Sequence, residues 1–268
     1  MRLVLVPTPI GNLEDITLRA IRELKEAEVV ACEDTRRTGV LLKHLGISKP
    51  LLRLDQHTIG QARKLLQGYG RVAYVTDAGT PGISDPGAEL VALALQEGWQ
   101  LEVLPGPTAL IPALVASGLP TARFAFEGFL PQKRSEREAR LKQVAEGRTV
   151  VLYEAPHRLR ATLEDLVQFY GPEHPVAVAR ELSKAHEEVW RGTLAGALAH
   201  FQAPRGEFVL VLGPKAPTPQ VPLEAEPLVG ALRKKGLEGK ALVRALVEAG
   251  IPRNQAYALA HQKTEANR

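Results

Sequence analysis

The chain has 268 residues, of which 45% are hydrophobic, and a formal net charge of +4, so it is long enough for two domains and too apolar to be disordered. Its single cysteine excludes an intrachain disulfide or a cysteine zinc site, and no stretch approaches the ~20 apolar residues of a membrane span. We therefore expect a cytoplasmic globular protein with no membrane-spanning segment, whose mildly basic charge permits nucleic acid binding without demonstrating it.

The first half of the chain alternates between predicted strands and helices. Short apolar runs predict strands, and apolar residues three or four positions apart predict helices. The predicted strands cover 2–8, 28–34, 71–77 and 99–105, and the predicted helices cover 17–27, 35–47, 58–70, 86–98 and 106–118. Leu18, Ile21 and Leu24 are expected on one face of the first helix, and Asp85 with Pro86 is expected to begin the fourth. This alternation is typical of βαβ units around a mostly parallel sheet.

The second half predicts a second α/β domain and a helical tail. Predicted strands lie within 148–158, 175–194 and 206–214, and a helix covers 161–171. The segments 121–131 and 132–147 are interpreted as a crossing between the domains. The predicted organisation is a first domain over 1–118, a second over 119–214, a proline-rich linker over 215–222 and a helical unit over 223–268. Gly250 separates two short amphipathic helices at helix-turn-helix spacing in that unit.

Glycine- and proline-rich segments follow several of the predicted strands. TDAGTPGISDPG (76–87) follows the strand at 71–77, and PTPIGNLEDIT (7–17), CEDTRRT (32–38) and PGPTAL (105–110) follow three others. Open α/β sheets bind ligands at the carboxyl ends of their strands, and glycine lets a ligand approach the backbone closely. One such loop is as often a plain tight turn, whereas several at one sheet edge indicate a cleft.

Two polar clusters, in the segments 153–158 and 179–188, accompany apolar strands of the second half. Their charged and imidazole side chains are those of Glu154, His157, Arg158, Arg180, Glu181, Lys184, His186 and Glu187. The histidines lie far apart in the sequence with few carboxylates beside them, so no metal site is predicted. Basic runs at 132–142 and 233–244 are interpreted either as solvated helix faces or as phosphate contacts.

These segments together resemble the bacterial ribosomal RNA small subunit methyltransferase I family. DAGTPGISDPG combined with YEAPHR is the most specific part of a resemblance that runs from Val6 to the helical tail. The family is similar in fold to the tetrapyrrole (precorrin) methylases, so we expect two α/β domains with S-adenosylmethionine in the cleft between them, followed by a small helix-turn-helix-like unit. The resemblance implies 2′-O-methylation of a cytidine ribose in the decoding region of 16S ribosomal RNA, within the small ribosomal subunit, by a homodimer.

The resemblance also assigns roles to residues. The cofactor is expected to contact Thr8, Pro9, Asp77, Ala78, Gly79, Thr80, Ile83, Pro105 and Gly106, with the segment Phe126–Leu130 closing the pocket. A ribose hydroxyl is a weak nucleophile, and the candidates for the proton acceptor or an orienting group are Glu181, Lys184, His157 and Asp34. Arginine stays charged and donates bidentately, which makes the candidate substrate contacts Arg36, Arg158 and Arg180. The helical unit is expected to hold the RNA.

Two other functions remain open from the residues alone. One is a methylase of a tetrapyrrole or another small acceptor, and the other is a non-catalytic RNA-binding protein that kept a cofactor pocket. A nucleotide hydrolase is disfavoured, because the sequence has no P-loop and no set of carboxylates suited to a metal.

Overall fold

The computed structural model describes residues 1–144, 147–215, 225–251 and 253–261. The chain divides into two compact units, one up to Lys215 and one formed by the helices beyond it. Apart from Lys215, the predicted linker at 215–222 lies outside the described residues. None of the described helices has the length and apolar character needed to cross a membrane.

The first sheet is parallel throughout and confirms the prediction from strand and helix alternation. Its strand order is β3-β2-β4-β1-β5. The strands are β1 (Arg2–Leu5), β2 (Val29–Cys32), β3 (Leu51–Arg53), β4 (Arg71–Val75) and β5 (Gln100–Val103). Strand β3 is missing from the sequence prediction because three residues are too few to show a periodic or apolar run.

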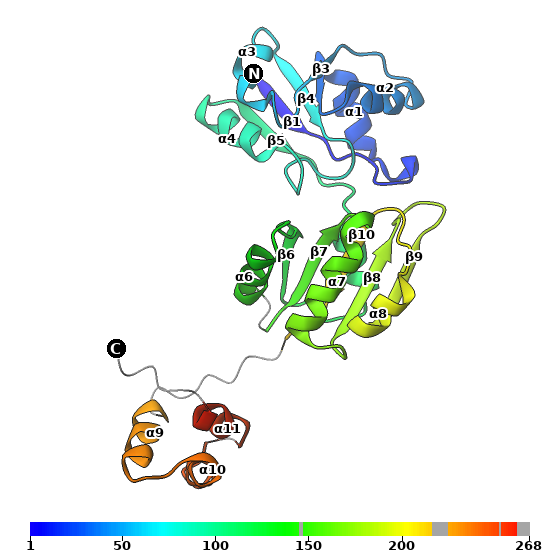
Figure 1. The fold of residues 1–268 in the computed structure, drawn as a ribbon. Coiled ribbons are helices and arrows are strands. Elements are labelled where there is room, and N and C mark those ends of the chain that lie inside the picture. The colour runs from blue at the N-terminus through cyan, green and yellow to red at the C-terminus, as the bar shows by residue number, and fades with distance from the viewer. Residues whose placement is uncertain (145–146, 216–224, 252, 262–268) are drawn as a thin grey trace. The chain divides into compact units, whose positions relative to one another are not determined.

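Helices cover both faces of this sheet (Figure 1), and alternate strand residues pack against opposite layers. Leu3 and Leu5 pack with α3 (Ala62–Leu65) and α4 (Ala88–Gln96), whereas Val4 and Val6 pack with α1 (Leu18–Glu26) and α2 (Thr35–His44). The neighbouring strands β1 and β4 therefore send their connections to opposite faces of the sheet. In open α/β sheets such a switch point leaves a crevice at the carboxyl ends of the strands.

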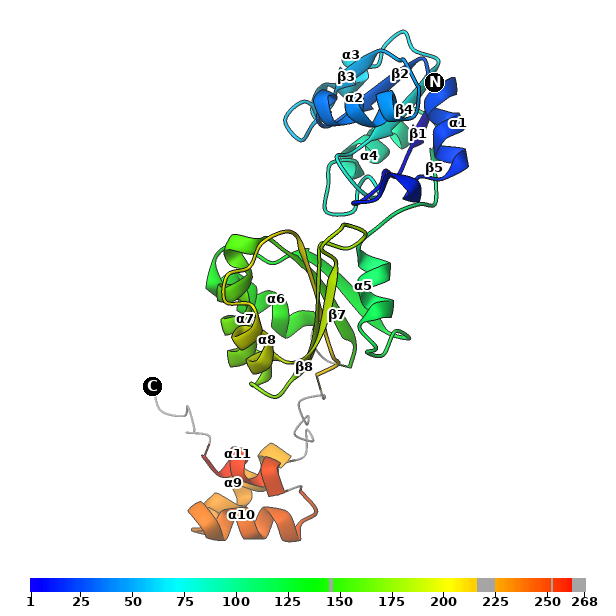
Figure 2. The same ribbon diagram turned by 90° about the vertical axis from the view of Figure 1, so that its right-hand side faces the viewer.

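The second sheet is mixed and has the order β6-β7-β10-β8-β9. Only β6 and β7 run parallel, and the other neighbours are antiparallel. The strands are β6 (Phe124–Phe129), β7 (Thr149–Glu154), β8 (Pro175–Arg180), β9 (Glu188–Thr193) and β10 (Phe208–Leu212). The helices α6 (Arg134–Val144), α7 (Pro156–Tyr170) and α8 (Leu194–His200) cover one face, and α5 (Leu110–Ala116) packs on the other (Figure 2).

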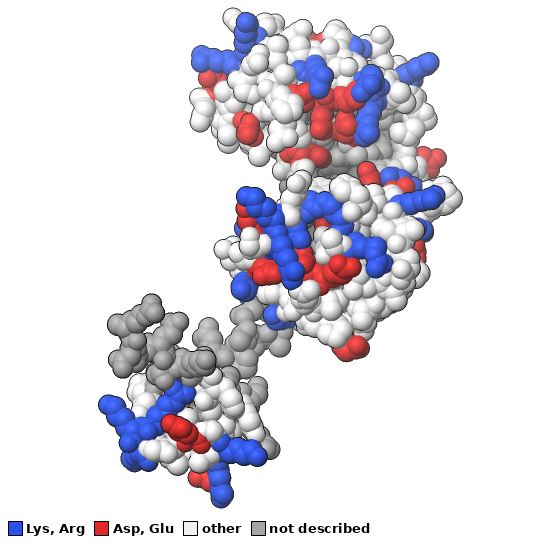
Figure 3. Space-filling view, in the orientation of Figure 1, with Lys and Arg blue, Asp and Glu red and all other residues white. Residues whose placement is uncertain are grey.

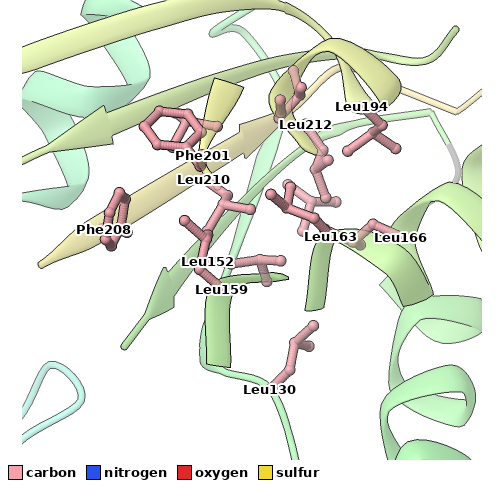
Figure 4. Packing of buried hydrophobic residues seen from close by; sticks show 14 of the residues in the cluster. Leu130, Leu152, Leu159, Leu163, Leu166, Leu194, Phe201, Phe208, Leu210 and Leu212 are labelled. Atoms are coloured by element: carbon pink, nitrogen blue, oxygen red, sulfur yellow. The ribbon is translucent and has the colours of Figure 1, made fainter. Parts of the chain in front are cut away.

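The helix-covered face of the second sheet holds an aliphatic core. Leu152 of β7 and Leu210 of β10 point toward Leu159 and Leu163 of α7, with Phe208 at the edge of the cluster (Figure 4). All five side chains are buried. This packing holds β7 and β10 rigidly, and their ends reach the site described below.

The prediction of a crossing over 121–131 and 132–147 is wrong. Most of the first segment forms β6, which pairs with β7, and the second contains α6, whose Leu141 is buried against the sheet. The hydrophobic pattern did not show these elements because α6 consists mainly of charged residues. In addition, a register shift between Phe126 and Gly128 interrupts β6. Helix α8 was also not predicted.

Two details of the first helices differ from the prediction. Leu18 is 87% exposed, and the buried residues of α1 are Ala20, Glu23 and Leu24. Helix α4 begins at Ala88 after Gly87, so Asp85 is not its cap. Gly87 has φ +148°, a conformation that keeps Asp85 and Pro86 within the preceding loop. The segment 58–70 forms a 3₁₀ turn and the one-turn helix α3, not a continuous helix.

Loops from the two sheets pack closely at Gly11. A Cβ at this position would lie 2.5 Å from Lys184 Cγ and 2.9 Å from the backbone oxygen of Leu182. The loop after β1 thus rests against the turn between β8 and β9, and only a residue without a side chain allows this distance.

The described part of the C-terminal unit contains α9 (Ala225–Lys234), α10 (Gly239–Glu248) and α11 (Arg253–His261). Leu242, Leu246 and Leu259 are buried among these helices. Gly250, with φ +87°, ends α10 before the turn to α11, as the helix-turn-helix spacing predicts.

Replacing Gly11 by Ala should loosen the contact between the loops, because the new methyl group meets the Leu182 carbonyl. We expect Gly11→Ala to lower the free energy of unfolding by about 1–3 kcal/mol, the usual cost of overpacking. Gly60→Ala is the matched control, because a Cβ there meets nothing within 4 Å. Urea denaturation of both variants measures the difference, and equal stability of the two would contradict the interpretation.

Candidate functional site

A cavity of about 490 Å³ lies where the loop after β4 faces the second sheet. This volume is in the range of pockets that enclose a small molecule, roughly 300–1,000 Å³. The loop contributes Ala78, Gly79, Thr80, Ile83, Ser84 and Asp85. The second sheet and the loops at its ends contribute Phe129, Tyr153, Glu154, Ala155, Pro156, His157, Glu207, Phe208 and Val209, and Ile10, Thr108 and Ala109 complete the walls.

The structure thus brings four of the predicted cofactor residues together in one wall. Ala78, Gly79, Thr80 and Ile83 all line the cavity. Gly79 has φ +79° and Gly82 has φ +88°, so the loop uses backbone conformations that favour glycine. The Thr80 hydroxyl donates to the Pro107 carbonyl at 3.0 Å, which joins this loop to the one after β5.

Thr8 lies beneath the loop and not in the cavity wall. Its amide donates to the Gly79 carbonyl and its carbonyl accepts from the Gly79 amide, both at 2.9 Å. Its hydroxyl donates to the Thr76 carbonyl at 3.3 Å. Thr8 therefore holds the loop in place, and its predicted contact with the cofactor stays a prediction.

Three further predicted cofactor residues lie beside the cavity. Gly106 packs on Pro7, since a Cβ there would lie 2.7 Å from the Pro7 Cβ. It lines a neighbouring hollow of about 430 Å³ that shares Ile10 and Thr108 with the main cavity. Pro9 and Pro105 belong to the same two loops and line neither space.

The Asp77 side chain is directed to α2. It forms an ion pair with Arg37 at 3.2 Å, and its Oδ1 atom is buried without a hydrogen bond. Asp77 is not among the residues that line the cavity. The structure thus places this carboxylate behind the wall that its neighbours form.

Asp34 and Arg36 pair with each other at the start of α2. The Asp34 carboxylate accepts from the Arg36 amide at 2.8 Å and caps the helix, and the Arg36 guanidinium lies 2.9 Å from it. These hydrogen bonds lower the pKa of Asp34 to about 2. A carboxylate of such low pKa is a weak base, and neither residue lines the cavity.

In the segment YEAPHR, only His157 among the predicted residues is exposed at the cavity. It occupies the first turn of α7 after Pro156. Arg158 donates to the Leu130 carbonyl at 2.6 Å and pairs with Glu154 at 3.3 Å. Glu154 is buried and accepts from the Ala155 amide at 2.8 Å and from the Thr162 hydroxyl at 2.6 Å. Arg158 and Glu154 therefore fix the start of α7 to the end of β6.

The segment ARELSKAHEE forms a turn stabilised by its own charges. Lys184 Nζ donates to Glu181 at 2.8 Å and to Glu207 at 2.9 Å, and the Glu207 amide donates to Glu181 at 2.8 Å. Glu181 has φ +51°, a strained value for this residue type, and Arg180 pairs with Glu188 across β8 and β9 at 3.0 Å. Glu181, Lys184 and Arg180 do not line the cavity, although Lys184 contacts Glu207, which does.

Most residues that line the cavity were not predicted as site residues, and two of them, Tyr153 and Asp85, lie in segments that drew attention. Tyr153 stacks edge-on with Phe126 at 4.8 Å and with Phe129 at 5.9 Å between ring centroids. Its hydroxyl contacts the Thr108 side chain and the Leu110 amide, and burial raises its pKa. The YEAPHR motif contains Tyr153, but sequence alone gives no sign that the ring faces the cavity.

Asp85 is the second missed residue. Burial raises the pKa of its carboxyl to about 6, and the nearby carboxylates of Glu33 and Asp77 add to this shift. Burial likewise raises the pKa of Glu33. Within the described ranges no cation forms an ion pair with Asp85, and no group of metal-binding side chains occurs. The site therefore combines an apolar and aromatic wall, a loop of bare backbone and a carboxyl whose pKa is raised.

The chain is similar to known methylases over most of its length. The family model described as Tetrapyrrole (Corrin/Porphyrin) Methylases matches residues 2–198. The chain is 48% identical to ribosomal RNA small subunit methyltransferase I of Synechocystis sp., and the match covers 96% of each. A protein of the same name from Thermotoga maritima is 43% identical, and that match covers 80% of this chain and 99% of the relative.

A solved structure supports the same relationship. The uroporphyrin-III C-methyl transferase from Thermus thermophilus, complexed with S-adenyl homocysteine, superposes with a TM-score of 0.58 at 26% identity. The superposition covers 80% of this chain and 97% of that one.

We expect Asp85→Asn to stabilise the protein at high pH. A carboxyl whose pKa is raised by folding contributes stability below pH ~4 that is lost as the pH rises through about 6. A shift of about two units corresponds to at most ~3 kcal/mol, and the partial exposure of Asp85 reduces it. Thermal unfolding of both proteins at pH 4 and pH 8 tests this: the variant should unfold at a higher temperature only at pH 8. A variant that is less stable at pH 8 would mean that Asp85 is a structural residue.

Proposed function

The chain belongs to the family of ribosomal RNA small subunit methyltransferase I within the tetrapyrrole methylases, and from this premise we propose that it methylates the 2′-hydroxyl of a cytidine ribose in 16S ribosomal RNA. The methyl donor is S-adenosylmethionine. The observation that carries the proposal is the cavity at the switch point of the first sheet, whose wall is the loop 76–87 and whose opposite side is the second sheet. The segments at this cavity are those on which the family resemblance rests.

The residues at the cavity fit S-adenosylmethionine. Ala78, Gly79 and Thr80 line one side, and the lack of a side chain at Gly79 lets a nucleoside approach the backbone closely. Phe129 and Tyr153 offer aromatic surface on the other side. When bound, the cofactor supplies a methyl group that is already activated by its sulfonium sulfur.

The chain's own contribution is then to place the acceptor oxygen and exclude water. The loop is held from below by the paired backbone hydrogen bonds of Thr8 and Gly79, and laterally by the bond from Thr80 to Pro107. Rigid support of this kind allows alignment of the reacting atoms, which can supply about 7–11 kcal/mol of the barrier in favourable cases. His157, at the exposed edge, is available to contact the substrate.

The acceptor is proposed to be RNA because of the relatives' shared name and the charge of the C-terminal unit. Residues 225–261 contain six Lys or Arg and three Glu. Figure 3 shows more basic than acidic side chains on the visible face of these helices. Basic side chains bind the phosphate backbone, and the helices α10 and α11 have the spacing of a nucleic-acid-binding motif.

The unit is proposed to add affinity without taking part in the chemistry. The Thermotoga maritima relative matches 80% of this chain across 99% of its own length, so about a fifth of this chain has no counterpart in it. That share is close to the part of the chain beyond Lys215. The homodimer expected from the resemblance also remains a proposal, and the exposed Ile111 and Val115 of α5 are apolar residues that a partner copy could cover.

Transfer of labelled methyl groups from S-adenosylmethionine tests the reaction. We expect label on small ribosomal subunits that lack the modification, at a single cytidine 2′-oxygen found by mapping the RNA. Free 16S ribosomal RNA and a tetrapyrrole acceptor serve as parallel substrates. Label on the tetrapyrrole and not on RNA would move the function to a small acceptor, as in the uroporphyrin enzyme.

Ending the chain at Lys215 tests the role of the helical unit. We expect the truncated protein to bind S-adenosylmethionine as the full chain does, because the cavity lies within the first unit. Its KM for the small subunit should rise and the dependence of binding on salt should weaken, because phosphate contacts are lost. Equal KM values for the two proteins would exclude an RNA-binding role for the unit.

A further inference from the structure

Asp85 differs from Glu154 and Glu207 because, among the described residues, it has no charged partner and its side-chain hydrogen bond is with the neutral Thr76. Within the part of the chain that the structure describes, no ion pair to Asp85 is found, although it lines both the main cavity and a smaller hollow beside α4. The carboxylate therefore keeps lone pairs available toward the space where the substrates must meet.

The other carboxylates and the phenol at the cavity are less suited to accept a proton, and His157 is the rival candidate. Glu154 is buried, and its oxygens accept from the Ala155 amide and the Thr162 hydroxyl. Glu207 is bonded to Lys184 Nζ at 2.9 Å. The pKa of Tyr153 is raised by burial, so its hydroxyl stays protonated. His157 is exposed at the first turn of α7.

The backbone before Asp85 is held in a conformation that a free loop would avoid. Ser84 has φ +62°, which is uncommon for a residue with a side chain. A Cβ on Gly128 of β6 would lie 2.7 Å from the Ser84 hydroxyl, so the bare backbone of the second sheet makes room for this residue. Strain of this kind persists where the surrounding structure enforces it, often at functional sites.

We propose that Asp85 is the group that accepts the proton of the ribose 2′-hydroxyl during methyl transfer, an inference that rests on the proposed function. As the ribose oxygen forms its bond to the methyl carbon, the carbon–sulfur bond breaks and its electron pair stays on sulfur. The hydroxyl proton passes to an Asp85 carboxylate oxygen and is later released to water. General-base assistance of this kind typically contributes about 10²- to 10⁴-fold to the rate.

The charged groups around Asp85 decide the pH at which it can act. Glu33 follows β2, Asp77 follows β4 and Glu207 precedes β10, and all three disfavour its ionised form. Arg37 of α2 pairs with Asp77 and offsets part of that charge. Tyr74 and Tyr153 remain neutral because burial raises the pKa of each phenol. Burial is the largest cause of the raised pKa of Asp85, about 6, so the carboxylate form predominates above that pH.

The test compares Asp85→Asn with the wild type in single-turnover methylation of small subunits across pH 5 to 8.5. The wild-type rate should rise about tenfold per pH unit below pH 6 and level off above it, because one deprotonation is required. Asp85→Asn should be slower by about 10²- to 10⁴-fold at pH 8 and should lack this rise. Its dissociation constant for S-adenosylmethionine and its KM for the subunit should be unchanged.

Two further measurements separate a base from a structural residue. Asp85→Glu keeps a carboxylate at this position. Its methylation rate should be lower than that of the wild type but should again rise with pH. Thermal unfolding of the protein without substrates should show the titration of Asp85 near pH 6 in the wild type and not in Asp85→Asn. Glu89→Gln is the matched control, because this exposed carboxylate lines the small hollow beside Asp85. This variant should keep both the wild-type rate and its rise with pH.

The outcomes distinguish the inference from the function beneath it. If the wild type is active and the methylation rate of Asp85→Asn still rises with pH, the role of Asp85 is overturned. The proposed function then stands. Loss of S-adenosylmethionine binding in Asp85→Asn would also overturn it, because the residue would then support the cofactor site. A wild type that methylates no ribose would refute the proposed function, and the proton transfer with it.

Discussion

The site depends on the pair of backbone hydrogen bonds between Thr8 and Gly79. These residues follow β1 and β4, neighbouring strands whose connections leave toward opposite faces of the first sheet. At this switch point the loops after β1 and β4 would otherwise diverge. The two hydrogen bonds hold the loop after β4 at the edge of the sheet. The Ala78–Ile83 wall of the cavity starts from this anchor, and the second sheet supplies the facing wall.

The two sheets contribute different chemistry because they are built differently. The parallel sheet ends in loops of glycine and proline, which expose backbone groups and allow close approach. The mixed sheet ends in Phe129, Tyr153 and Phe208, which supply apolar surface, and its strands β7 and β10 pack on a core of leucines. Glycines at the points of contact, Gly11 and Gly128 among them, allow the loops of one sheet to touch the other.

Most of the charged residues in the recognisable motifs maintain this arrangement. Asp34 caps α2, Arg158 and Glu154 tie the start of α7 to β6, and Glu181 with Lys184 supports a strained turn. Burying or constraining charge is costly unless it is paired, so such residues are engaged by neighbours. Asp85 departs from this pattern, and its raised pKa is the consequence of leaving a carboxylate partly buried without a cation.

The sequence by itself determined most elements of the first sheet, because apolar periodicity is a local signal, and its glycine-rich loops predicted a site at the strand ends. It predicted the loop 76–87 as a binding loop, but it could not tell which charged side chains face the cavity. The roles of β6 and α6 were misjudged for a related reason, since charged residues and a register shift hide their apolar faces. Only the tertiary structure turned Asp34 and Glu181 to their partners and left Asp85 toward the cavity, because side-chain direction and burial depend on neighbours that lie far away in the chain.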